Sequence, residues 1–169
     1  MGRPPKRPQD IPALSEAQKA WMAGFLDGEG HFGVSRTVRR KNGHRYYVPI
    51  IQVAQAGQLG MQMLTDLQVE LGGIGSIAKR NSPSFRRMAK ERNWRRSNTL
   101  MLYGPVVPAL CRMLLPYLRL KLRQAELLVN WPQRRVLGLG MGHGTKGDIE
   151  GEQIQIQLME RIRSLNHEP

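Results

Sequence analysis

The sequence has little cysteine, few aromatic residues and few acids, and it lacks any long hydrophobic run. Its single cysteine, Cys111, excludes an intrachain disulfide and, with only four histidines, argues against a structural zinc cluster. No segment reaches the roughly 18 apolar residues that a membrane-spanning helix needs, so the chain is not predicted to insert into a membrane. The basic N-terminus has no apolar stretch after it, which argues against a secretory signal and favours an intracellular protein.

The shortage of acids leaves the chain with a large positive charge. Lys and Arg number 26 against 13 Asp and Glu, which gives a net charge of +13. Half of the basic residues lie in two stretches, 36–45 and 79–96, which contain one acid, Glu91. A surface that only needs to be soluble interleaves both signs, so segregated charge predicts a polyanionic partner. Nucleic acid is the first candidate, an anionic membrane surface the second, and a merely soluble basic face the third.

Length and composition predict one globular domain with short additions. The chain has 169 residues, of which 40% are hydrophobic, enough for a core. Residues 1–14 are rich in proline and read as a flexible basic arm, and residues 138–150 read as a glycine-rich linker. We therefore expect a core domain over residues 15–137 and a C-terminal helix over residues 151–169.

Hydrophobic periodicity and turn signals predict the order αββαββα, followed by further helix. Residues 15–18 (SEAQ) fit a capping box, and Asn42-Gly43 is a strong hairpin signal. Two hairpins can form one antiparallel sheet, with helices on one face and the other face open. The expected helices span 15–27, 59–71, 106–115, 119–131 and 152–165, and the expected strands span 31–40, 46–54, 74–80 and 98–103.

The first helix is apolar on all sides over residues 21–26, which is unusual in a small chain. Such a helix is covered on both sides, so we expect one side to face the core and the other a partner. A fully buried central helix in a monomer is the alternative. The small residues suited to close helix packing are Ala20, Ala23, Gly24 and Gly28.

Residues 22–30 (MAGFLDGEG), at the end of a capped apolar helix leading into a strand, resemble the motif of the LAGLIDADG homing endonucleases. Residues 52–55 (QVAQ) and 115–124 (LPYLRLKLRQ) resemble two further segments of the family's single-motif, homodimeric members. The likeness covers roughly residues 15–131. It implies an α+β fold of the αββαββα LAGLIDADG endonuclease type, in which an antiparallel saddle-shaped sheet is covered by helices on one face, here with an added C-terminal helix.

The resemblance implies a metal-dependent catalytic site. Glu29 corresponds to the family's metal-binding acid, with the carbonyl of Gly28 beside it, and the implied cation is Mg²⁺ or Mn²⁺, whereas Ca²⁺ is implied to bind without supporting cleavage. Gln55 matches the residue that positions water, and Lys121 matches the active-site lysine, supported by Gln124. Asp27 is interpreted as structural, capping backbone groups at the helix junction. One departure is Leu59, where the small homodimers can carry a basic residue, so proton handling must differ or activity must be lower.

The resemblance also implies which side chains face DNA, although a slip of one residue would invert every assignment. Gln52 and Arg80 are the preferred readers of base edges. The strand residues expected on the DNA face are His31, Gly33, Ser35, Thr37, Tyr46, Val48, Ile50, Gln52, Ala78, Arg80, Asn98 and Leu100. The residues expected to hold phosphates are Arg39, Arg40, Lys41, Arg86, Arg87, Arg95 and Arg96.

The function so implied is that of an intron-encoded homing endonuclease. As a homodimer it would make a double-strand break by metal-dependent hydrolysis in a long, roughly palindromic DNA site. Its partners would be double-stranded DNA and a second copy of itself, with no small-molecule substrate. The alternatives are a non-cleaving nucleic-acid binder of the same fold, such as an RNA splicing maturase or a regulator, and a protein of anionic membrane surfaces.

Overall fold

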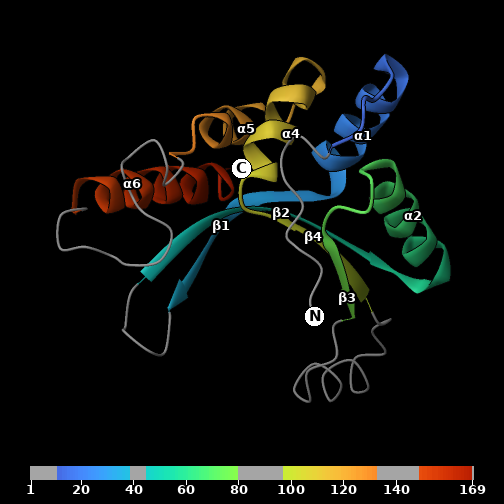
Figure 1. Cartoon of the computed structure of the whole chain (residues 1–169), viewed down its shortest axis with the longest axis horizontal. Helices are drawn as coiled ribbons and strands as arrows, with labels where there is room; N and C mark the ends of the chain where they lie inside the picture. Colours follow the sequence, from blue (N-terminus) through green and yellow to red (C-terminus); the bar gives the residue numbers. More distant parts are fainter. Residues whose placement is uncertain (1–10, 39–44, 80–96, 133–148, 169) are drawn as a thin grey trace.

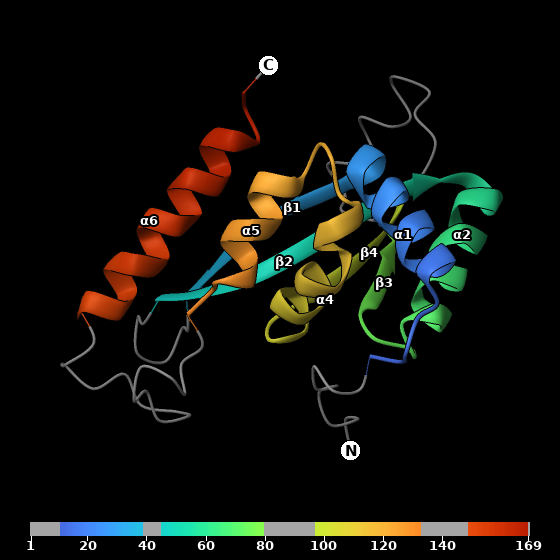
Figure 2. The same cartoon turned by 90° about the horizontal axis from the view of Figure 1, so that it is seen from above.

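One antiparallel sheet carries the described helices on a single face (Figures 1 and 2). The computed structural model describes residues 11–38, 45–79, 97–132 and 149–168. The strands are β1 (Gly30–Val38), β2 (Arg45–Ala56), β3 (Ser76–Lys79) and β4 (Ser97–Tyr103), in the order β1-β2-β4-β3. The helices are α1 (Glu16–Glu29), α2 (Gly57–Glu70), α4 (Val106–Leu114), the 3₁₀ turn η2 (Leu115–Tyr117), α5 (Leu122–Val129) and α6 (Ile149–Leu165). The predicted α+β architecture is confirmed.

Strand register decides which side chains enter the core. Phe32 lies opposite Ile51, and Val53 lies opposite Leu100, and all four side chains are buried beneath the helices. Because side chains alternate along a strand, Leu102 joins Leu100 in the core. The expectation that Leu100 faces DNA is therefore wrong, since only 1% of its surface is exposed. The same alternation places Asn98 on the helix-covered side, which corrects its assignment as well.

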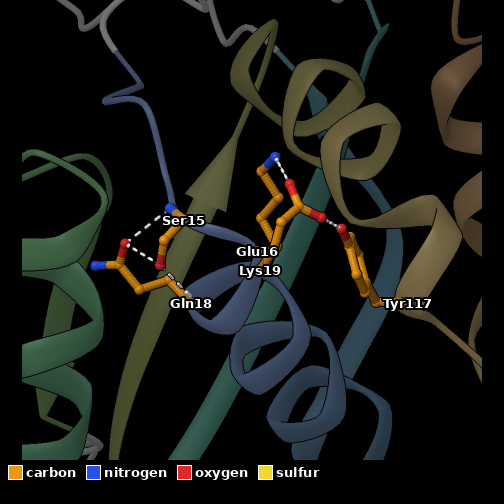
Figure 3. Close-up of polar contacts among 5 residues, drawn as sticks. All are labelled: Ser15, Glu16, Gln18, Lys19 and Tyr117. Carbon is orange, nitrogen blue, oxygen red and sulfur yellow. Dashed lines mark hydrogen bonds and ion pairs between the residues drawn. The ribbon is translucent and has the colours of Figure 1, made fainter.

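The first turn of α1 is held as its sequence predicts. The amide of Gln18 donates to Ser15 Oγ at 3.3 Å, and the amide of Ser15 donates to Gln18 Oε1 at 2.9 Å, which completes the capping box (Figure 3). Glu16 accepts from the Lys19 ammonium at 2.7 Å and from the hydroxyl of Tyr117. The beginning of α1 is thereby attached to η2.

The other end of α1 is attached to the segment between η2 and α5. The carboxylate of Asp27 accepts the backbone amides of Arg119 at 2.6 Å and Lys121 at 2.9 Å. A carboxylate at a helix C-terminus faces the negative end of the helix dipole, and Asp27 is also buried. Two charge-assisted hydrogen bonds offset both costs. Asp27 is thus a structural residue, as interpreted from the sequence.

The C-terminal helix completes the core. Ile162 of α6 is buried, and α6 lies beside α5 and β1 (Figure 2). The side-chain amide of Asn166, just after α6, donates to the carbonyl of Phe32 at 2.8 Å.

None of the described helices is long and apolar enough to cross a membrane.

We predict that Asp27→Asn lowers the free energy of unfolding by about 2 kcal/mol, because it removes the charge from two buried hydrogen bonds. Urea denaturation measures the change. The matched control is Asp66→Asn on α2, where the carboxylate accepts from Gln62 at 2.8 Å on the exposed surface. That control should cost less than about 0.5 kcal/mol. Equal losses in the two variants would contradict the role given to Asp27.

We predict that Cys111 resists alkylation in the folded protein. Burial raises the pKa of the thiol to about 12, and no part of the side chain is exposed. Because the thiolate is the reactive form, iodoacetamide at pH 8 should leave the native protein unmodified and react fully in guanidinium chloride. Mass spectrometry measures the labelling. Alkylation of native and unfolded protein at similar rates would show that the residue is not enclosed.

Candidate active site

Glu29 stands at the sharp junction between α1 and β1, with its side chain exposed. The amide of Gly30 donates to the carbonyl of Leu26 and so closes the helix. A Cβ on Gly30 would clash with that same carbonyl oxygen, so only glycine fits. The chain therefore turns from helix to strand within one residue and leaves the Glu29 carboxylate pointing out of the core.

Gln55, near the end of β2, is the hydrogen-bond partner of Glu29. Its side-chain amide donates to Glu29 Oε2 at 3.1 Å, so the structure brings these two predicted site residues together. Gly60, in the first turn of α2, lies against Gln55: a Cβ there would be 2.8 Å from the Cβ of Gln55. The close approach of α2 thus supports Gln55 from behind. Gly60 was not predicted as a site residue, and the only signal for it in the sequence is a glycine inside a predicted helix.

The backbone of Lys121 is held at the same end of α1 by Asp27. It is the N-cap residue of α5, and its backbone amide is the one that Asp27 holds at 2.9 Å. Asp27 and Glu29 are two residues apart on α1, so the end of one helix positions both the carboxylate and the lysine. The positive charge of Lys121 also contributes to lowering the pKa of His31, at the beginning of β1.

His31 follows the junction on the open face of the sheet. Partial burial lowers the pKa of His31 below its ordinary value, and the positive charges of Lys121 and His167 lower it further. The imidazole lies over Gly33, because a Cβ at Gly33 would be 2.7 Å from His31 Nε2. The neutral form of the ring is thus favoured more than in a free histidine, and a neutral imidazole can both donate and accept a hydrogen bond.

The oxygen donors at the junction fit a hard divalent cation. Within the described parts of the chain, no group of three or more His, Cys, Asp or Glu side chains could hold a metal. One carboxylate, Glu29, and the backbone carbonyl of Gly28 suit Mg²⁺ or Mn²⁺, which keep water and phosphate oxygens as their other ligands. The donor set is thus compatible with a cation shared with a nucleic-acid phosphate.

One face of α1 is exposed. Ala20, Gly24 and Gly28 lie on it, and Trp21, which is 43% exposed, stacks on Phe25 with ring centres 5.7 Å apart. Ala23 is different: it is fully buried in the core of its own chain, so of the structural and dimer-interface roles expected for it, burial fits the structural one. The exposed face also removes the alternative of a helix buried on all sides within one chain.

The open face of the sheet carries most of the described residues that were expected to face DNA. His31 and Ala78 are exposed, and Ser35, Val48 and Gln52 are partly exposed. Gly33 lies under His31, and Ile50 is only 7% exposed. Thr37 and Tyr46 face each other across β1 and β2, and their side chains lie outside the description. The basic residues that were expected to contact DNA and lie outside the described ranges are Arg39, Arg40, Lys41, Arg80, Arg86, Arg87, Arg95 and Arg96.

The register places other side chains on this face that the sequence analysis missed. Met101 lies opposite Gln52 and Ser76, and Tyr103 lies opposite Ile50 with 57% of its surface exposed. The signal was available, because leucines at positions 100 and 102 mark the buried face of β4 by their alternation.

Leu59 is the departure from the family pattern. It lies in the first turn of α2, four residues after Gln55 in the chain, and 87% of its surface is exposed. An apolar side chain therefore projects into solvent at this position. The cationic residues whose backbone Asp27 holds at the end of α1 are Arg119 and Lys121.

The chain was compared with known proteins. A sequence model described as LAGLIDADG endonuclease matches residues 22–103. No curated protein matches the sequence. Among solved structures, the homing endonuclease I-CvuI in complex with DNA and Mg is similar with a TM-score of 0.53 and 24% identity, covering 91% of this chain and 98% of that one.

Two further structures agree with this fold. The archaeal intron-encoded homing endonuclease I-Vdi141I complexed with DNA has a TM-score of 0.60 at 19% identity, covering 91% of this chain and 87% of that one. I-SmaMI bound to uncleaved DNA with calcium has a TM-score of 0.53 at 19% identity, covering 90% of this chain but 46% of that one. The family resemblance is thereby confirmed: residues 22–103 are a LAGLIDADG endonuclease sequence, and the chain has the LAGLIDADG endonuclease fold.

Proposed function

We propose that this protein is a site-specific DNA endonuclease that works as a homodimer and cuts both strands of a long, roughly palindromic duplex. The observation that carries the proposal is the convergence of Glu29, Gln55 and Lys121 at the end of α1, through the Gln55–Glu29 and Asp27–Lys121 hydrogen bonds. These groups come from segments far apart in the sequence. The family match and the DNA complexes of similar structures support the same function.

Each residue of the site has a role that its placement allows. A cation held by Glu29 and the Gly28 carbonyl would supply activation of water and stabilisation of the leaving oxygen when bound. Gln55 orients the Glu29 carboxylate through its hydrogen bond and can position a water molecule on its other side. Lys121, held by its backbone, offers a positive charge to the phosphate as negative charge develops there.

The exposed face of α1 supports a dimer. Glycines are costly inside helices, yet at Gly24 and Gly28 a Cβ would meet nothing within 4 Å in the chain. Packing within the chain therefore does not require glycine at either position. Close approach of a second α1 would require it, and the two copies of Glu29 would then lie near each other at the ends of the paired helices.

The open face of the sheet supports DNA binding. Two-stranded antiparallel ribbons fit the major groove, and the side chains of Ser35 and Gln52 on this face can reach base edges. The net charge of +13 supplies attraction to phosphates. Two subunits would then cover two half-sites, which is the reason for proposing a roughly palindromic target.

We predict that Glu29→Gln slows Mg²⁺-dependent cleavage by at least about 100-fold, because the variant loses the charge that holds the cation. Gel analysis of duplexes from a randomised library, cut by the wild-type protein, measures the rate. Glu126→Gln, the same chemical change on the exposed surface of α5, is the control and should leave the rate unchanged. Specific binding by a wild-type protein that never cleaves would favour the non-cleaving binder instead.

We predict that Gly24→Leu converts the dimer to a monomer at the same protein concentration, because the larger side chain blocks close helix packing. The isolated chain has room for it, and leucine favours a helix more than glycine does. Sedimentation velocity measures the mass, and circular dichroism verifies the fold. Glu160→Leu on α6 is the control. A dimer that persists in Gly24→Leu would place the interface elsewhere.

A further inference from the structure

A small polar network joins the end of α6 to both halves of the candidate site. The side-chain amide of Asn166 donates to the carbonyl of Phe32 at 2.8 Å. The side-chain amide of Gln124 donates to Asn166 Oδ1 at 3.3 Å and to the carbonyl of Leu165 at 3.4 Å. Asn166 is therefore both donor and acceptor, between β1 on one side and α5 on the other.

The two partners of Asn166 lie close in sequence to the proposed catalytic residues. Phe32, in β1, comes three residues after Glu29. Gln124, in the first turn of α5, comes three residues after Lys121. β1 is an edge strand of the described sheet, so among the described strands none bonds its outward carbonyls. Asn166 supplies the missing donor to one of them, and in doing so it fastens α5 to that strand.

The partners of Asn166 are buried, although Asn166 itself is partly exposed. Phe32 is fully buried, and Gln124 is only 4% exposed, so the groups that Asn166 bonds are costly to leave without a partner. Within the described residues, Gln124 Oε1 has no hydrogen-bond partner, so the orientation of this side chain depends on its two bonds to the end of α6. Without the Asn166 side chain, the carbonyl of Phe32 and the amide of Gln124 would each lose a partner away from water.

We propose that Asn166 is a positioning residue for the nuclease reaction. It holds the beginning of α5, and with it Lys121, at a fixed separation from the strand that follows Glu29. Asp27 fixes Lys121 from the helix side, and Asn166 fixes the same helix turn from the strand side. Asn166 lies outside residues 22–103, so the family match does not assign it. The inference rests on the proposed endonuclease function.

The test compares Asn166→Ala with the wild-type protein on a duplex that the wild type cleaves. Because small displacements of a catalytic group are costly, the single-turnover cleavage rate should fall about 10-fold or more, while the DNA dissociation constant in Ca²⁺ changes less than about 2-fold. Asn166→Asp keeps an acceptor for Gln124 but cannot donate to Phe32, so it should be as slow as alanine. Ser164→Ala, an exposed change two residues earlier, is the control and should cleave normally.

A double-mutant cycle separates positioning from general stability. In a Lys121→Ala background, Asn166→Ala should slow cleavage by less than about 2-fold further, because the group it positions is already gone. The same fold-loss in both backgrounds would overturn the inference. So would an effect confined to the dissociation constant, or an equal loss in Ser164→Ala.

Hydrogen–deuterium exchange distinguishes failure of this inference from failure of the proposed function. Asn166→Ala should speed amide exchange in peptides covering residues 118–128, and Ser164→Ala should not. If the wild-type protein cleaves no duplex with Mg²⁺ or Mn²⁺ and exchange still speeds up, the endonuclease proposal fails while the contact between α6 and α5 holds. Unchanged exchange in Asn166→Ala overturns the inference itself.

Discussion

The arrangement of the site depends on one buried carboxylate. Asp27 accepts the amides of Arg119 and Lys121, which are 92 and 94 residues further along the chain. Because it binds backbone rather than side-chain atoms, it fixes the path of the segment before α5 whatever the lysine side chain does. Glu29 leaves the same helix two residues later. The separation between the exposed acid and the lysine-bearing turn is therefore set by the fold.

Four glycines in or near the site, Gly24, Gly28, Gly30 and Gly60, form two pairs, and glycine is present in each pair for a different physical reason. Gly30 and Gly60 are required within the chain, since a Cβ would strike Leu26 in one case and Gln55 in the other. Gly24 and Gly28 are not, because the space beside them is empty. A sequence motif cannot separate these two reasons, but the structure can. The first pair shapes the site, and the second pair leaves a helix face that a second subunit can approach.

Much of the fold follows from local sequence signals, and the exceptions have physical explanations. The capping box at Ser15 and the Gln55–Glu29 pair depend on short-range patterns or on the family likeness, and both are present. The prediction of which β4 side chains face DNA was wrong, because a period of two residues allows two opposite assignments. The buried leucines at 100 and 102 select the other one. The bond from Asn166 to Phe32 spans 134 residues and leaves no local trace in the sequence.

The charges near Glu29 limit how the proposed reaction can be assisted. Partial burial of the ring and the positive charges of Lys121 and His167 lower the pKa of His31, so a positive charge on this ring is disfavoured. Leu59, four residues after Gln55 in the chain, is an exposed apolar side chain in the first turn of α2 and adds no charge. Asp27 holds the backbone of two cationic residues, Arg119 and Lys121, at the end of α1. In the proposed reaction, negative charge developing on a phosphate would be balanced by Lys121 and by a cation bound at Glu29, so the backbone-held position of Lys121 would matter for the rate.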